Sequence, residues 1–204
     1  GQTRNPVAKG QHPYAIIVAC SDSRVPPEIL FDTGLGEIFV IRVAGNVVAS
    51  HELGSIEYAA EHLGSSLVMV LGHERCGAAT ATVDAKGKSE GNIGSLVQSI
   101  APAVKTARKK NSKASNADLV ESSISENVKL VAQNIQKQSK VKIVGAKCDF
   151  DEGTIQVVDL HKVDSSGCSR GRIFSIPGDS CVTCSRCPII ILVCLSVPPV
   201  PHIH

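Results

Sequence analysis

The chain has 204 residues, of which 43% are hydrophobic and 20% are charged, and its formal net charge is +2. This length is sufficient for one domain with a full core. The balanced charge and the scarcity of aromatic residues (four Phe, two Tyr and no Trp) argue against nucleic acid as a partner. The longest late apolar run, residues 188–197, is about half of the ~20 residues that span a bilayer, so no membrane partner is expected.

The elements follow an α/β order. Short continuous apolar runs without alternation predict strands buried on both faces of a parallel sheet; they are residues 14–20, 37–43, 66–72 and 141–146. Between them, residues 50–64 predict a helix with Ser50 as its N-cap and Gly64 as its stop. Residues 94–110 predict a second helix bent at Pro102, and a third begins near Asn116. Residues 148–160 resemble a hairpin. The predicted fold is a mostly parallel central sheet flanked by helices.

Eight cysteines are spread unevenly, with five of them from Cys168 to Cys194. This distribution argues against a single disulfide framework. Because no secretion signal is visible, an intracellular compartment, cytoplasmic or organellar, is favoured, and clustered Cys and His then indicate metal. Residues 164–204 have no clear periodicity, so the chain divides into a domain at 1–163 and a Cys/Pro-rich tail at 164–204.

The stretch "VACSDSRVPP" places Cys20, Asp22 and Arg24 at alternate positions directly after an apolar run. In "VLGHERCGAAT", His73 and Cys76 stand three residues apart, also after a predicted strand. Sites in open α/β sheets form at the carboxyl ends of strands, so both groups are expected to face one crevice.

Two thiolates and one imidazole are a ligand set of catalytic zinc, with a fourth position left for water or an anion. If Asp22 took that position, the site would be closed. A guanidinium grips a carboxylate with two hydrogen bonds, so Arg24 is the residue expected to hold Asp22 away. Taken singly, each of these features is more often a small core cysteine, a chance pair or a loop ion pair.

The segments "ACSDSRVPPEILFDTGLGEIFVIRVAGNVV" and "GSIEYAAEHLGSSLVMVLGHERCGAATA" closely resemble the β-class carbonic anhydrases, and the resemblance runs from about Gly10 to about Leu160. It implies that Cys20, His73 and Cys76 bind zinc. It also implies that Asp22 either binds zinc in a closed state or pairs with Arg24 in the active one.

The implied reaction is reversible hydration of carbon dioxide to bicarbonate and a proton by zinc-bound hydroxide, with Asp22 and Arg24 as a gating dyad. The resemblance implies that five further residues line the substrate pocket: Gln11, Phe39, Ala44, Tyr58 and Gly77. Core packing is the alternative role of Phe39 and Tyr58. The proton shuttle is not identified; His51 and His62 are candidates that also fit plain surface histidines.

The resemblance further implies a homodimer or a higher homo-oligomer. Members of the family usually carry N-terminal helices that wrap the partner subunit, whereas only about ten residues precede Gln11 here. The segment between Ile135 and Val141 also looks short for the family. We therefore expect a weakened dimer interface and a chain that is a fragment or variant with a surviving zinc site.

Three alternatives remain open. The pocket could take another linear substrate, such as carbon disulfide or carbonyl sulfide. The chain could be an inactive zinc-binding scaffold with Asp22 permanently on the metal. In the tail, three cysteines at C-x2-C-x2-C spacing, with one further on, could hold a second zinc or part of an iron–sulfur site, although an unstructured tail is favoured; these are Cys181, Cys184, Cys187 and Cys194.

Overall fold

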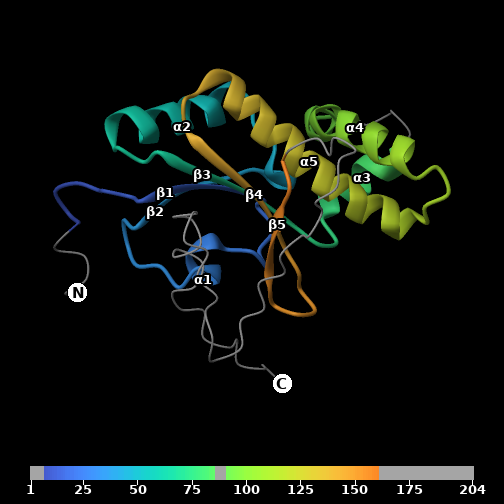
Figure 1. Ribbon diagram of the computed structural model, residues 1–204, viewed down its shortest axis with the longest axis horizontal. Helices are drawn as coiled ribbons and strands as arrows, with labels where there is room; N and C mark the ends of the chain where they lie inside the picture. The colour runs from blue at the N-terminus through green and yellow to red at the C-terminus, as the bar shows by residue number, and fades with distance from the viewer. Residues whose placement is uncertain (1–6, 86–90, 161–204) are drawn as a thin grey trace, which may run out of the picture.

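The computed structural model describes residues 7–85 and 91–160, and these form one sheet with helices packed on it (Figure 1). Its strands are β1 (Ala15–Ala19), β2 (Ile38–Arg42), β3 (Leu67–His73), β4 (Lys142–Cys148) and β5 (Ile155–Val158). Its helices are α1 (Pro27–Leu30), the 3-10 turn η1 (Ala44–Asn46), α2 (Ser50–His62), α3 (Gly77–Asp84), α4 (Ile93–Lys110) and α5 (Asn116–Gln138).

The sheet has the strand order β2-β1-β3-β4-β5. The first four strands in this order are parallel, and β5 runs antiparallel to β4. The four apolar runs are therefore parallel strands. A hairpin is present, but residues 148–160 supply only the last residue of β4, the turn and β5, because its first strand is the apolar run of β4. Because β1 and β3 are adjacent and parallel, the residues that follow them meet at the same end of the sheet, where the strands have their carboxyl ends.

Both faces of the central strands are buried, which explains their unbroken apolar sequence. Ile16 and Val18 of β1 belong to a cluster that contains residues of α2 and of the C-terminal half of α5. Ile17 and Ala19 belong to a second cluster, which continues beyond the strand ends into α3 and α4. Figure 1 shows α2 and α1 on opposite sides of the strands.

Helix α2 begins one residue differently from the prediction. Its N-cap is Ala49, not Ser50, and the Glu52 carboxylate closes the first turn by accepting a hydrogen bond of 2.8 Å from the Ala49 N–H. An acidic residue at the third helical position can satisfy this donor, so a hydroxyl cap is not required. At the other end, Gly64 has φ +76° just beyond the helix, as expected of a C-terminal glycine stop.

The other two predicted helices are confirmed. Pro102 lies inside α4, which continues to Lys110. Helix α5 begins at Asn116, and its N-cap Ser115 accepts a hydrogen bond of 3.1 Å from the Asp118 N–H. A connection of three residues, 139–141, separates α5 from β4.

Glycines in the sheet allow α5 to lie close to it. A Cβ atom on Gly72 of β3 would come within 2.7 Å of Val128 on α5, and one on Gly145 of β4 within 2.8 Å of the same side chain. Val128 is itself fully buried. This close approach brings α5 to the carboxyl ends of the strands, where the candidate site lies.

In residues 7–85 and 91–160, no helix is both long and apolar enough to cross a bilayer. The tail and all of its cysteines lie outside the described residues, so the division of the chain at residue 163 stays a prediction.

Candidate metal centre

Cys20, His73 and Cys76 converge at the carboxyl ends of β1 and β3, and we call them the Cys-His-Cys group. Their ligand atoms all lie within 4.8 Å of one another, and all three side chains are buried. Cys20 directly follows β1, His73 is the last residue of β3, and Cys76 is the N-cap of α3. The predicted convergence of the two strand ends is therefore confirmed.

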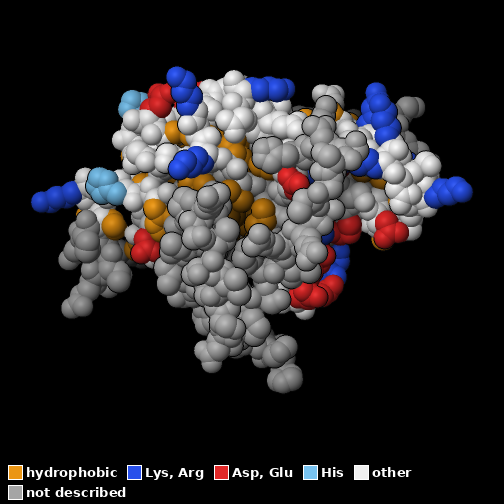
Figure 2. All heavy atoms as spheres, in the orientation of Figure 1, with side chains coloured by type: hydrophobic (Ala, Val, Ile, Leu, Met, Phe, Trp, Pro, Cys, Tyr) orange, Lys and Arg blue, Asp and Glu red, His pale blue; other side chains and the backbone are white. Residues whose placement is uncertain are grey.

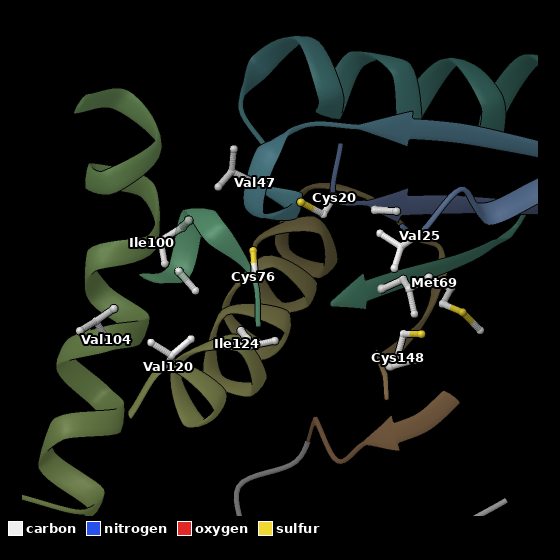
Figure 3. Close-up of a cluster of buried hydrophobic side chains, with 14 of the residues drawn as sticks. Cys20, Val25, Val47, Met69, Cys76, Ile100, Val104, Val120, Ile124 and Cys148 are labelled. Atoms are coloured by element: carbon white, nitrogen blue, oxygen red, sulfur yellow. The ribbon is translucent and has the colours of Figure 1, made fainter. Parts of the chain in front are cut away.

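Figure 3 shows the two cysteines of the group at the junction of the sheet and α3, with their sulfur atoms directed into the same space. Cys148, another buried cysteine, lies apart from them beside Met69 (Figure 3). Two of the three cysteines in the described part of the chain therefore belong to the group.

The imidazole of His73 is oriented by its own strand end. Its Nδ1 lies 2.8 Å from the Glu74 carbonyl oxygen, which fixes Nδ1 as the hydrogen-bond donor. Its Nε2 is buried and has no hydrogen-bond partner among the described residues. A buried ring nitrogen with a free lone pair is costly unless something binds it.

The Cys20 sulfur accepts a hydrogen bond of 3.1 Å from the Gly45 backbone N–H. Hydrogen bonding from Cys76, and further from the Gly45 N–H, lowers the pKa of Cys20 to about 4. The neighbouring Cys20 sulfur and burial together raise the pKa of Cys76. Cys20 is therefore ionised more readily than Cys76, and a cation bound to both sulfur atoms would displace the remaining proton.

Asp22 and Arg24 form a two-point ion pair beside the group. Arg24 donates from Nε to Oδ1 at 2.9 Å and from Nη2 to Oδ2 at 2.7 Å, and its backbone N–H also donates to Oδ1 at 3.0 Å. These hydrogen bonds from Arg24 hold the pKa of Asp22 well below its usual range. The carboxylate nevertheless remains close to the group, with Oδ2 3.9 Å from Nε2 of His73.

Sequence reasoning missed two residues that support this arrangement. Arg42, at the end of β2, donates to the carbonyl oxygens of Cys20 at 2.9 Å and Asp22 at 2.7 Å. The Phe150 ring lies 4.6 Å from the Arg24 guanidinium carbon and 5.5 Å, between ring centroids, from His73. Arg42 was foreseeable as a charge in an otherwise apolar strand, whereas nothing near Phe150 in the sequence links it to the site.

The turn between His73 and Cys76 is held from outside. Arg75 has φ +50°, which is uncommon for a residue with a side chain. Its N–H donates to Glu121 of α5 at 2.8 Å, and its guanidinium makes two hydrogen bonds of 3.0 Å to Asp151. Figure 2 shows acidic side chains gathered over the β4–β5 hairpin with basic atoms beside them.

A cavity of about 480 Å³ beside this turn is lined by Glu74, Arg75 and Glu121 among others, but by no member of the Cys-His-Cys group.

The five predicted pocket residues occupy separate elements. Phe39 of β2 and Tyr58 of α2 have ring centroids 6.4 Å apart, and Tyr58 is 48% exposed, which does not fit a purely core role. Ala44 opens η1 beside the group, and Gly77 opens α3 directly after Cys76. Gln11 is exposed, and none of its described contacts reaches the group. The pocket roles of these residues stay predictions.

The two candidate shuttle histidines lie on α2. His51 and His62 are both exposed, and His62 stacks against Tyr58 with ring centroids 5.5 Å apart. No described contact joins either histidine to Cys20, His73 or Cys76. Their role as a proton shuttle therefore stays a prediction. Both are surface histidines in the structure.

The residues of the group fit zinc. Two sulfur ligands and one neutral imidazole nitrogen are a common zinc set. His73 Nε2 has a free lone pair, and the other ring nitrogen, Nδ1, is already hydrogen-bonded to the Glu74 carbonyl oxygen. This arrangement is usual for a metal-binding histidine. Because Asp22 is held by Arg24, a fourth coordination position would be open.

Comparison with known proteins gives a consistent result. The family model described as carbonic anhydrase matches residues 15–159. A carbonic anhydrase of Mycolicibacterium smegmatis is 43% identical over 111 residues, which is 53% of this chain and 54% of that protein. The chain thus spans about half the length of the curated relatives that head this comparison.

Solved structures of β-carbonic anhydrases share the fold. The enzyme of Coccomyxa, solved with acetazolamide, superposes with a TM-score of 0.67 at 25% identity, covering 77% of each chain. One of two tetrameric enzymes of Sordaria macrospora gives a TM-score of 0.61 at 24% identity, covering 76% of this chain and 85% of that one. With its family match across the sheet and this fold around a Cys-His-Cys group, the chain belongs to the carbonic anhydrase family, in its β class.

Proposed function

We propose that the protein catalyses the reversible hydration of carbon dioxide to bicarbonate and a proton with zinc. The observation that carries this proposal is the juxtaposition of the Cys-His-Cys group with a carboxylate held away by an arginine. A purely structural zinc site has four protein ligands, whereas a catalytic site keeps one position for water or substrate.

Cys20, His73 and Cys76 would hold the metal. Zinc bound there supplies a Lewis acid that turns water into a nucleophile near neutral pH. The Glu74 carbonyl fixes the His73 tautomer so that Nε2 faces the metal, and the Gly45 N–H moderates the charge on the Cys20 sulfur. These two contacts orient the His73 and Cys20 side chains toward the metal position.

Asp22 would act as a hydrogen-bond acceptor beside the metal. Because Arg24 keeps the pKa of Asp22 low, the Asp22 carboxylate stays ionised throughout the neutral range and can only accept hydrogen bonds. It would therefore orient the attacking oxygen with its proton toward the carboxylate and a lone pair toward carbon dioxide. Arg24 holds this carboxylate, and its release would let Asp22 reach the metal and close the site, which is the gating role we propose.

We infer that the substrate lies against Ala44, Gly77 and the rings of Phe39 and Tyr58, with Gln11 contributing from the segment before β1. These residues lie on elements that begin or end near the group or flank β2. A pocket of this chemistry, largely apolar with a few polar groups, suits a small linear molecule. Carbonyl sulfide and carbon disulfide share that shape, so turnover of carbonyl sulfide is one of the outcomes of the test below.

We also propose that the protein assembles as a homo-oligomer. Large apolar side chains stay exposed around the β2 edge, among them Tyr14, Leu35 and Tyr58. A neighbour of the same fold is described as tetrameric, which supports the proposal. An intracellular compartment, expected from the cysteines, also remains a proposal.

The test is stopped-flow hydration of carbon dioxide by full-length protein with quantified zinc. Wild type should be active in proportion to its zinc. Cys76→Ala should lose zinc and activity together, because it removes a ligand. Asp22→Asn and Arg24→Ala should keep zinc and lose about a hundredfold or more in rate, because they remove the oriented acceptor.

Cys148→Ala is the matched control, since Cys148 is an equally buried cysteine outside the group. It should retain both zinc and rate. Full zinc occupancy without hydration of carbon dioxide at any pH would contradict the proposal and indicate a scaffold. Turnover of carbonyl sulfide in place of carbon dioxide would contradict the substrate but retain the site.

A further inference from the structure

The turn η1 has an unusual backbone next to the metal site. Gly45 has φ +70° and Asn46 has φ +45°, so two successive residues adopt the left-handed conformation. Glycine and asparagine are the residue types that adopt this conformation most readily. The conformation aims the Gly45 N–H at the Cys20 sulfur, 3.1 Å away.

A residue 82 positions later holds this turn. Asn127, on α5, donates from Nδ2 to the Gly45 carbonyl oxygen at 2.8 Å. Asn127 is 4% exposed, and Ile100 and Ala78 close the space beside Gly45. The two polar groups of Gly45 are thus both occupied, one by the Cys20 sulfur and one by Asn127.

Apolar packing does not account for an asparagine at this position. Its Oδ1 is buried and has no hydrogen-bond partner within residues 7–85 and 91–160. Val128 next to it and Ile124 one turn before it are apolar and buried, so a leucine would suit the surroundings. A buried acceptor without a partner is unfavourable. An apolar residue of similar shape would avoid that cost at Oδ1, but it would leave the Gly45 carbonyl oxygen without its donor.

We propose that Asn127 is a positioning residue for Cys20, which it reaches through the Gly45 carbonyl and N–H. This inference rests on the proposed zinc site but goes beyond the reaction. Asn127 fixes the turn, the turn fixes the N–H on the sulfur, and the sulfur enters the site in one orientation. Such outer contacts typically change metal affinity by about 10- to 100-fold.

The experiment compares Asn127→Leu and Asn127→Ser with wild type in the full chain. Zinc affinity is measured by competition with a chromophoric chelator, and the Gly45 amide proton of the zinc-loaded protein is followed by NMR. Both variants should fold with a lowered melting temperature, because the buried Gly45 carbonyl oxygen loses its donor. They should also bind zinc about 10- to 100-fold more weakly and move the Gly45 resonance upfield as its hydrogen bond weakens.

Ser123→Ala is the matched control. Ser123 is buried on the same helix, but its hydroxyl donates only to the Leu119 carbonyl of that helix. Unchanged zinc affinity and an unchanged Gly45 resonance in folded Asn127 variants would overturn the proposal, as would an equal loss in Ser123→Ala.

A wild-type measurement keeps the proposal testable if both variants fail to fold. In cadmium-113-substituted protein, scalar coupling from the metal to the Gly45 amide proton and slow exchange of the Asn127 side-chain amide would support it. Fast exchange of that amide would overturn it. None of these readouts requires turnover, so an inactive protein that binds zinc would contradict the proposed reaction and leave this inference standing.

Discussion

The orientation of Arg24 depends on neighbours besides Asp22. The Phe150 ring lies under its guanidinium at 4.6 Å, and Nη2 is also 3.4 Å from the Arg75 carbonyl oxygen. An aromatic face attracts a guanidinium and restricts its rotation. Arg24 itself is exposed, so its grip on Asp22 relies on geometry rather than on exclusion of water. A ring near the C-terminal end of the described chain and a backbone carbonyl from its middle therefore orient the ion pair.

Cys148 allows a prediction of pH dependence. Burial raises the pKa of its thiol to about 11 from an ordinary value of 9. The folded state therefore keeps a proton that the unfolded chain loses between these two values, and stability falls with rising pH there. Two pH units correspond to roughly 2–3 kcal/mol.

Denaturant unfolding of wild type and Cys148→Ala between pH 8 and pH 11 checks this expectation. The free energy of unfolding should fall more steeply for wild type above pH 9, because the variant lacks this titration. The other cysteines are common to both proteins and cancel in the difference. Parallel curves across the whole range would contradict the prediction.

Individual residues of the site differ in how far they could be predicted. Cys20, Asp22 and Arg24 are close in sequence, and their chemistry is readable from spacing alone. Phe150 and Asn127 contact the site from 126 and 82 positions away from their partners, Arg24 and Gly45. Only the packing of the β4–β5 hairpin and of α5 onto the strand ends brings them there, and no local pattern encodes that packing.

At the scale of elements, glycines have opposite roles in strands and helices. Gly145 of β4 has no room for a side chain, because a Cβ atom would lie 2.7 Å from Leu160 and 2.8 Å from Val128. Gly54 of α2 is exposed, and a Cβ atom there would meet nothing within 4 Å. The first glycine is required by close packing, whereas the second only weakens its helix.

We therefore expect Gly145→Ala and Gly54→Ala to change stability in opposite directions. Gly145→Ala should lower the free energy of unfolding by roughly 1–3 kcal/mol, since the core must shift. Gly54→Ala should raise it by about 0.5–1 kcal/mol, since alanine is the better helix former. Chemical denaturation measures both, and adding Val128→Ala should recover part of the loss in Gly145→Ala. Equal effects of the two single substitutions would rule this account out.

Strands and long helices were predictable because each has a clear pattern. The strands are continuous apolar runs, and α5 repeats its buried residues at helical spacing. The turn η1 was not predicted as an element, although its Gly45 and Asn46 are residue types that adopt positive φ. Its contacts with Asn127, Ile100 and Ala78 come from distant elements, and no local pattern indicates them. The capping of α2 by Ala49 and Glu52 was missed because a hydroxyl at residue 50 looked like the stronger signal.

At the scale of the whole molecule, the two edges of the sheet differ. Strands β5 and β2 form the two edges, and no described strand pairs with the outer side of either one, so the difference lies in the side chains around them. Exposed apolar side chains lie around β2: Leu35 precedes it, Tyr58 packs near Phe39 within it, and the Tyr14 N–H donates to Glu37 beside it. An unpaired edge with apolar surroundings is favourable for association with a second copy.

This asymmetry predicts that the chain self-associates through the β2 edge. Sedimentation equilibrium should give wild type at least twice the mass of one chain at tens of micromolar. Leu35→Glu should shift the mass toward a single chain, because Leu35 is 57% exposed and a carboxylate there would have to be desolvated on association. Val157→Glu places the same charge at a similarly exposed position, 52%, on the opposite edge strand β5 and should leave the mass unchanged. Dissociation by Val157→Glu alone would move the interface to β5, and a single-chain mass for wild type at every concentration would exclude association altogether.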